Sequence, residues 1–258
     1  MLETILKPIT MDLEKANDLL KKEFAYMLKR TGNITGLEHF LVSVSLRPAL
    51  VIVSSRIFGG NAEKTTILAA VMQFVYFASK VIDAISYDEP VPGIKGIGPL
   101  SGDRFKVLLG DYFHSRAAVI LQESGIKGMI RPLADIICRM QEARIQKKMM
   151  PDGATDIQTY RNIIQKESAE LIAGCCMLGA RLAGASTEEQ ETMASYGCNL
   201  GMAIYFSERD GSPDLVAHYL DKAREALLLI PDQPEKVILA QLIEKVTDSG
   251  IKTQRLVG

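Results

Sequence analysis

The stretch 65–79 contains 15 consecutive residues without a charged side chain, and it lies within a longer helical pattern over 62–85. Apolar residues occupy nearly every face of that pattern between positions 67 and 78, so the helix should be surrounded by other elements. A membrane span needs roughly 20 apolar residues, whereas this run is shorter and contains Gln73 and Tyr76. The sequence therefore predicts a helix buried at the centre of a bundle and no membrane span.

Helical periodicity dominates nearly everywhere, and strand-like alternation occurs only at 41–46, which is too short to predict a sheet. Thr187 and Gln190 form a predicted capping box at the start of one helix. Prolines and glycines concentrated in 90–102 predict a long loop. We expect an all-α chain in which 1–258 form a single domain. Besides 62–85, the expected helices cover about 103–124, 128–149, 156–184, 187–208, 213–230 and 234–248.

Charge and composition exclude several classes of protein. Lys and Arg number 30 against 31 Asp and Glu, for a formal net charge of -1, so no strong field attracts a nucleic acid. The N-terminal residues do not follow the order of a secretory signal, and we expect a cytoplasmic location. Neither a zinc-type spacing nor a histidine metal pattern is present, so reduced thiols and surface or capping histidines are expected. The residues concerned are Cys138, Cys175, Cys176, Cys198, His39, His114 and His218.

A series of landmarks then occurs in one order along the chain. They are Leu46-Arg47-Pro48, VIVSSRIFGG at 51–60, AAVMQFVYFASKVIDA at 69–84, VLLGDYFHSRA at 107–117, YRNIIQKESAELIAGCCMLGARLAGA at 160–185 and YGCNLGMAIYFSE at 196–208. Together these segments resemble the trans-isoprenyl diphosphate synthases over most of their fold. The resemblance implies an isoprenoid-synthase type of helical bundle, which here is truncated after the position of the second aspartate motif.

In that family, two DDxxD motifs hold the Mg²⁺ ions that ionise an allylic diphosphate, because Mg²⁺ prefers clustered carboxylate oxygens. The first motif aligns with 83–87, where Asp83 is the only remaining carboxylate. The second aligns with 208–212 and retains Glu208 and Asp210, with Arg209 between them. A cation at a ligand position would repel Mg²⁺. We therefore expect no metal cofactor unless the chain is a divergent active enzyme.

The resemblance also assigns residual roles outside the two motifs. Arg47 is the remaining base of the family's diphosphate-binding run, and Lys166 aligns approximately with a family lysine. Phe74, Ala78 and Ser79 fall where the family sets product length, which implies an apolar tunnel.

Each of these residues also has a plainer interpretation. Asp83 is either a residual metal or partner contact or a helix-terminal acid facing solvent. Glu208 and Asp210 regroup into an acidic site or belong to a solvated loop. Arg47 binds a phosphate or pairs with a nearby acid.

The leading functional hypothesis is a non-catalytic or regulatory subunit in isoprenoid biosynthesis, which forms a homodimer or a heterodimer with a catalytic homologue. One alternative is a divergent but active polyprenyl diphosphate synthase that uses Asp83 and Glu208 with Mg²⁺. Another is a protein that binds an isoprenoid chain or another lipid.

Overall fold

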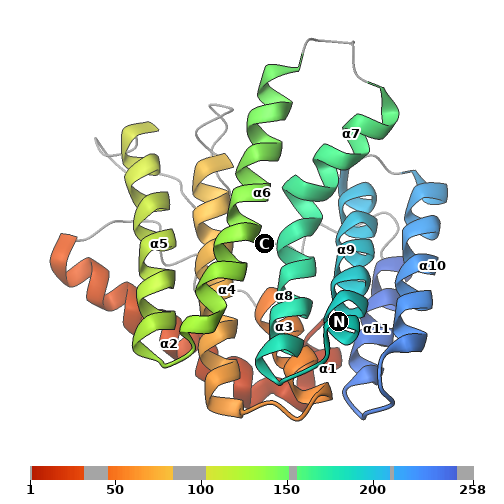
Figure 1. The fold of residues 1–258 in the computed structure, drawn as a ribbon, viewed down its shortest axis with the longest axis horizontal. Helices are drawn as coiled ribbons and strands as arrows, with labels where there is room; N and C mark the ends of the chain where they lie inside the picture. The colour runs from red at the N-terminus through yellow and green to blue at the C-terminus, as the bar shows by residue number, and fades with distance from the viewer. Residues whose placement is uncertain (1, 32–45, 84–102, 151–155, 210–211, 249–258) are drawn as a thin grey trace.

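The structure is a computed structural model that describes residues 2–31, 46–83, 103–150, 156–209 and 212–248, and these residues form helices and no strand. Most of the helices stand side by side as a bundle (Figure 1). The first half of the chain contributes α1 (Leu2–Leu6), η1 (Lys7–Ile9), α2 (Thr10–Thr31), α3 (Leu46–Ile57), α4 (Ala62–Asp83) and α5 (Asp103–Glu123). The second half contributes η3 (Lys127–Met129), α6 (Ile130–Met149), α7 (Ile157–Ile164), η4 (Gln165–Ala169), α8 (Glu170–Leu182), α9 (Thr187–Arg209), α10 (Pro213–Leu229) and α11 (Lys236–Asp248).

The all-α prediction is confirmed, and the helices expected after residue 61 end within a few residues of the observed bounds. The helix expected at 156–184 is continuous but contains one π-helical turn, η4, between α7 and α8. The loop expected at 90–102 lies outside the described residues. No bounds were predicted for the helices before residue 58.

The predicted capping box at Thr187 was wrong by one position. The Ser186 hydroxyl accepts a hydrogen bond from the backbone N–H of Glu189, and the Glu189 carboxylate accepts one from the backbone N–H of Ser186. Ser186 is therefore the N-cap, and Thr187 is the first helical residue. Both pairs satisfy the same spacing in the sequence, so the spacing alone does not choose between them.

Helix α4 occupies the centre of the bundle, as its apolar pattern predicts. It is long and apolar enough to span a membrane by length and composition, but 83% of its apolar window is buried inside the structure. Phe74 and Phe77 of α4 meet Phe24 of α2 and Phe113 of α5, with ring centroids 5.5–6.3 Å apart. These four rings form the aromatic cluster that joins three helices.

Helices α8 and α9 pack closely along a seam of small residues. A Cβ atom at Gly197 would lie 2.8 Å from the backbone of Ala173 and 2.9 Å from the sulfur of Cys176. At Gly201 it would lie 2.9 Å from Ala169. Glycine is therefore required at both positions for this helix separation.

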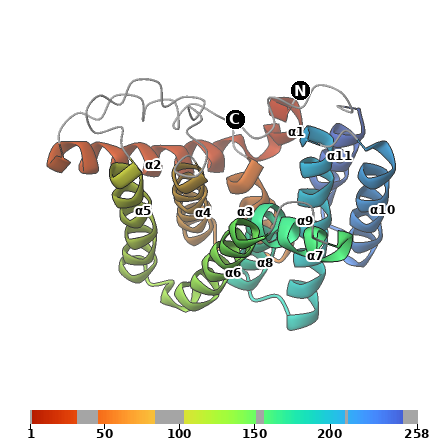
Figure 2. The same ribbon diagram turned by 90° about the horizontal axis from the view of Figure 1, so that it is seen from above.

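Helix α2 runs across one side of the bundle, over α4 and α5 (Figure 2). Two ion pairs attach it. Arg56 of α3 donates to Asp12 at 2.7 Å, and Arg116 of α5 donates to Glu23 at 2.6 Å. The partners are 44 and 93 residues apart in sequence. These ion pairs therefore hold α2 against helices that are distant from it along the chain.

The four cysteines are free thiols, as expected. Burial raises the pKa of Cys176 to about 12 and the pKa of Cys198 to about 11. Both side chains are therefore neutral and poorly nucleophilic at physiological pH.

Candidate functional site

Helices α4 and α9 both end at the same end of the bundle, which is the upper end in Figure 1. Asp83 is the last residue of α4, and Glu208 is the penultimate residue of α9. Arg47 is the second residue of α3. We call the set Arg47, Lys80, Asp83, Arg144 and Glu208 the charged end.

Asp83 forms an ion pair with Arg144 of α6, whose Nε lies 2.9 Å from Asp83 Oδ1. The same guanidinium donates from Nη2 to the hydroxyl of Ser79 at 2.6 Å. The Arg144 side chain is 10% exposed and the Asp83 side chain 38%. Asp83 is therefore a helix-terminal acid that is paired with a buried cation and still partly faces solvent, and a metal or partner contact for it stays a prediction.

The guanidinium of Arg144 also influences a histidine of helix α5. Burial lowers the pKa of His114 on α5, and the positive charge of Arg144 lowers it further, while Asp111 opposes the change. The neutral imidazole is therefore favoured beside Arg144.

Three cations influence the carboxyl group of Glu208. The residue as a whole is exposed, but its carboxyl group is partly enclosed, and this desolvation raises its pKa. Lys80, Arg47 and Arg209 act in the opposite direction. These cations come from α3, α4 and α9, so Glu208 lies in the electrostatic field of three helix ends.

Arg47 is 6% exposed and lies against Tyr76 of α4. Its guanidinium carbon is 3.5 Å from the ring centroid, a cation–π contact. Lys80 Nζ lies 5.5 Å from the centroid of the same ring. Arg47 forms no ion pair with a described residue, and its buried Nε has no hydrogen-bond partner there. Tyr76 is thus the contact of Arg47 that the structure shows, and both alternatives for Arg47, a phosphate and a nearby acid, stay predictions.

The described residues do not fit a Mg²⁺ site. Within 2–31, 46–83, 103–150, 156–209 and 212–248, no three His, Cys, Asp or Glu side chains gather as metal ligands. Asp83 is bound to a guanidinium, and three cations act on Glu208. A dication placed there would be repelled. Asp210 lies outside the described residues.

Lys166 lies in the π-helical turn η4 and is partly buried. The next residue, Glu167, accepts a hydrogen bond from Lys147 Nζ of α6 at 2.7 Å. A π-helical turn inside an α-helix often occurs at functional sites. Asp83 and Glu208 form no ion pair with a described residue of this turn, and a diphosphate-binding role for Lys166 stays a prediction.

The residues assigned to an apolar tunnel lie in one part of α4. Phe74 belongs to the aromatic cluster, and Ala78 is fully buried. The Ser79 hydroxyl faces Arg144 rather than an apolar space. The tunnel stays a prediction, with Arg144 now known to contact its proposed polar member.

Sequence reasoning missed Arg144, although a signal was present. Arg144 continues the buried positions Ile136 and Met140 of α6 at intervals of four residues. A cation on an apolar stripe indicates a buried partner, but the sequence did not show that Asp83, 61 positions earlier, supplies it.

Comparisons with known proteins match most of the chain. A family model described as "Polyprenyl synthetase" matches residues 42–220. Octaprenyl diphosphate synthase of Escherichia coli (strain K12) is 24% identical over 209 residues, which are 75% of this chain and 64% of that protein. Heptaprenyl diphosphate synthase component 2 of Geobacillus stearothermophilus is 28% identical over 167 residues, which are 63% of this chain and 52% of that protein.

A solved structure shows the same fold. The polyprenyl synthase of Caulobacter crescentus CB15, complexed with calcium and isoprenyl diphosphate, superposes with a TM-score of 0.82. It is 20% identical, and the match covers 95% of this chain and 97% of that chain. The chain spans less than two thirds of the length of the curated relatives described above.

Proposed function

Because the chain belongs to the polyprenyl synthetase family, we propose that it is a non-catalytic or regulatory cytoplasmic subunit that pairs with an active homologue in isoprenoid biosynthesis. The helical fold of the family is present, so a surface that recognises a related subunit can be present as well. The difference lies in the charged end, where cations contact or surround the two acids.

The observation that carries this proposal is the contact of Arg144 with Asp83. Ionisation of an allylic diphosphate requires positive charge against the departing group, and in this family Mg²⁺ held by clustered carboxylates supplies it. Here a guanidinium already neutralises Asp83. Arg144 is also held by the hydroxyl of Ser79, which leaves Asp83 less available to a metal ion.

Pairing with a homologue is supported by one relative's name. The Geobacillus stearothermophilus protein is described as component 2 of its synthase, a name that implies a further component. We infer that this chain likewise acts as one component of an assembly. It forms either a heterodimer with the active homologue or a homodimer.

The test is co-purification of the tagged chain from its native cells, followed by an assay of allylic diphosphate elongation. We expect a prenyl synthase homologue to accompany the chain. Its rate or product length should change when the chain is removed. If no homologue accompanies the chain, or if a homologue that does is unaffected, the subunit role is wrong.

A second candidate function is retention of an isoprenoid diphosphate without turnover. Arg47, Lys80 and Arg209 all act on the same end of the bundle, and positive charge of this kind suits a diphosphate. Native mass spectrometry of the protein from cells should then show a bound isoprenoid. Protein free of lipid would exclude this candidate.

A further inference from the structure

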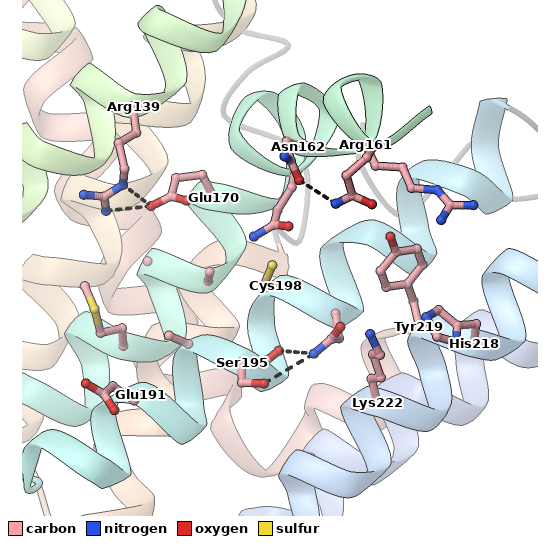
Figure 3. A pocket seen from close by; sticks show the side chains of 17 residues that line it. Arg139, Arg161, Asn162, Glu170, Glu191, Ser195, Cys198, His218, Tyr219 and Lys222 are labelled. Atoms are coloured by element: carbon pink, nitrogen blue, oxygen red, sulfur yellow. Dashed lines mark hydrogen bonds and ion pairs between the residues drawn. The ribbon is translucent and has the colours of Figure 1, made fainter. Parts of the chain in front are cut away.

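A cavity of about 600 Å³ lies among α6, α7, η4, α8, α9 and α10, and it shares no residue with the charged end. Figure 3 shows that side chains from α7, α9 and α10 converge on it. The connection between α9 and α10 consists of only residues 210–212, so the first turns of α10 return beside the last turns of α9. This return supplies the wall that carries His218, Tyr219 and Lys222.

Small side chains leave the space open. Ala173 and Gly174 of α8 and Ala194 and Ser195 of α9 line the cavity, close to the glycine seam that brings these helices together. Larger residues at Ala173, Ala194 and Ser195 would fill part of the volume, whereas a Cβ atom at Gly174 would meet Ile136 of α6. The space is thus a consequence of the same close packing that defines the α8–α9 seam.

The lining is mainly polar, and its cations are unevenly paired. Arg139 binds Glu170 at 2.6 Å, so these two charges compensate each other. Arg161 of α7 and Lys222 of α10 line the same cavity, but neither forms an ion pair with a described residue. The remaining acid of the lining is Glu191. Figure 3 shows Glu191 on the side of the cavity away from Arg161 and His218.

Arg161 and Lys222 both act on groups within the cavity. Burial raises the pKa of Cys198, Glu170 raises it further, and Lys222 lowers it. Burial also raises the pKa of Tyr219, and Arg161 lowers it. The positive charges of Arg161 and Lys222 therefore influence the electrostatic potential at residues that line the cavity.

We propose that this cavity binds a small polar metabolite whose phosphate or carboxylate group is held between Arg161 and Lys222. Two cations from different helices that form no ion pair with a described acid supply the charge-assisted donors such a group requires. Amide side chains of Gln158, Asn162 and Gln165 line the same space and suit a polar body rather than a hydrocarbon chain. The proposal is independent of the proposed function.

The test is isothermal titration calorimetry of the full chain with inorganic phosphate and, separately, with citrate at constant ionic strength. The unmodified chain should bind one of them saturably at a 1:1 ratio. Preference for phosphate assigns a phosphorylated metabolite, and preference for citrate assigns a carboxylate. The double variant Arg161→Met, Lys222→Met should bind at least about tenfold more weakly, since each charge-assisted hydrogen bond contributes on this scale.

The matched control is the double variant Arg181→Met, Lys64→Met, which removes the same two side-chain types from exposed positions outside the cavity. It should bind like the unmodified chain. Equal weakening of binding in both double variants would overturn the proposal. So would a titration of the unmodified chain that shows no binding of either anion at a concentration of about 10 mM. The methyl NMR signal of Met177, which lines the cavity, tests the unmodified chain directly. It should shift with saturating anion, and an unchanged signal would also refute the site.

Discussion

The interior of the bundle and its charged end are built from the same helices, but different forces shape them. In the interior, the aromatic cluster and the α8–α9 seam depend on shape, and each side chain has many neighbours. At the charged end, single contacts such as Arg144 with Asp83 decide the electrostatics. This difference teaches that the family fold can persist while the chemistry of one end changes, because few core contacts depend on those charges.

The largest expected effect is in the aromatic cluster. Phe113→Ala should lower the free energy of unfolding by about 3–5 kcal/mol, because the fully buried ring leaves a cavity against three other rings. Urea unfolding followed by circular dichroism measures the loss. On the same helix, Leu108 is 67% exposed, and Leu108→Ala should cost no more than about 0.5 kcal/mol. Equal losses would show that the cluster is not part of the core.

The α8–α9 seam should be next in sensitivity. Gly197→Ala should destabilise the fold by about 1–3 kcal/mol, because the new Cβ meets backbone atoms that have little room to move. Gly128→Ala adds the same methyl group where nothing lies within 4 Å, so it should be nearly neutral. Thermal unfolding of the two variants compares them. A neutral Gly197→Ala would mean that the helices are farther apart.

At the charged end, Asp83→Asn should lower the free energy of unfolding by about 1–2 kcal/mol. The substitution leaves the buried guanidinium of Arg144 without its carboxylate, although partial exposure of Asp83 reduces the cost. Asp135→Asn breaks an exposed pair with Arg131 and should have almost no effect. If both variants behave alike in urea, Arg144 does not depend on Asp83.

The smallest effect concerns a titration. The pKa of Glu208 is raised, so this group favours the folded state at low pH and contributes less as pH rises from the unfolded value through the folded one. Lys80→Met should raise the pKa of Glu208 further, since Lys80 is the strongest of the three cations that lower it. NMR titration of the Glu208 carboxyl measures the change. Lys64→Met, at the other end of α4, should leave it unchanged.

Helix positions were predictable because they depend on local patterns. Prolines and glycines mark the ends of α6, α9 and α10, and the apolar run over 65–79 gives the central position of α4. The N-cap at Ser186 was missed because two overlapping residue pairs satisfy one spacing. The fold of the family was equally recognisable from the order of its segments.

The candidate site was less predictable because its contacts join distant parts of the chain. Nothing in the local sequence pairs Asp83 with Arg144, and nothing places Arg47 on Tyr76. The cavity of Figure 3 depends on how six elements meet, so no single segment contains its signature. The loss of the motif carboxylates was visible in the sequence. The cations that lie near the remaining acids could be identified only from the structure.

The most direct test is an elongation assay of the isolated chain with Mg²⁺, an allylic diphosphate and isopentenyl diphosphate, beside an active member of the family. With Arg144 bound to Asp83 and cations around Glu208, we expect no product above the level of the buffer alone. Turnover on the order of 1 per second, a typical enzyme rate, would contradict the account.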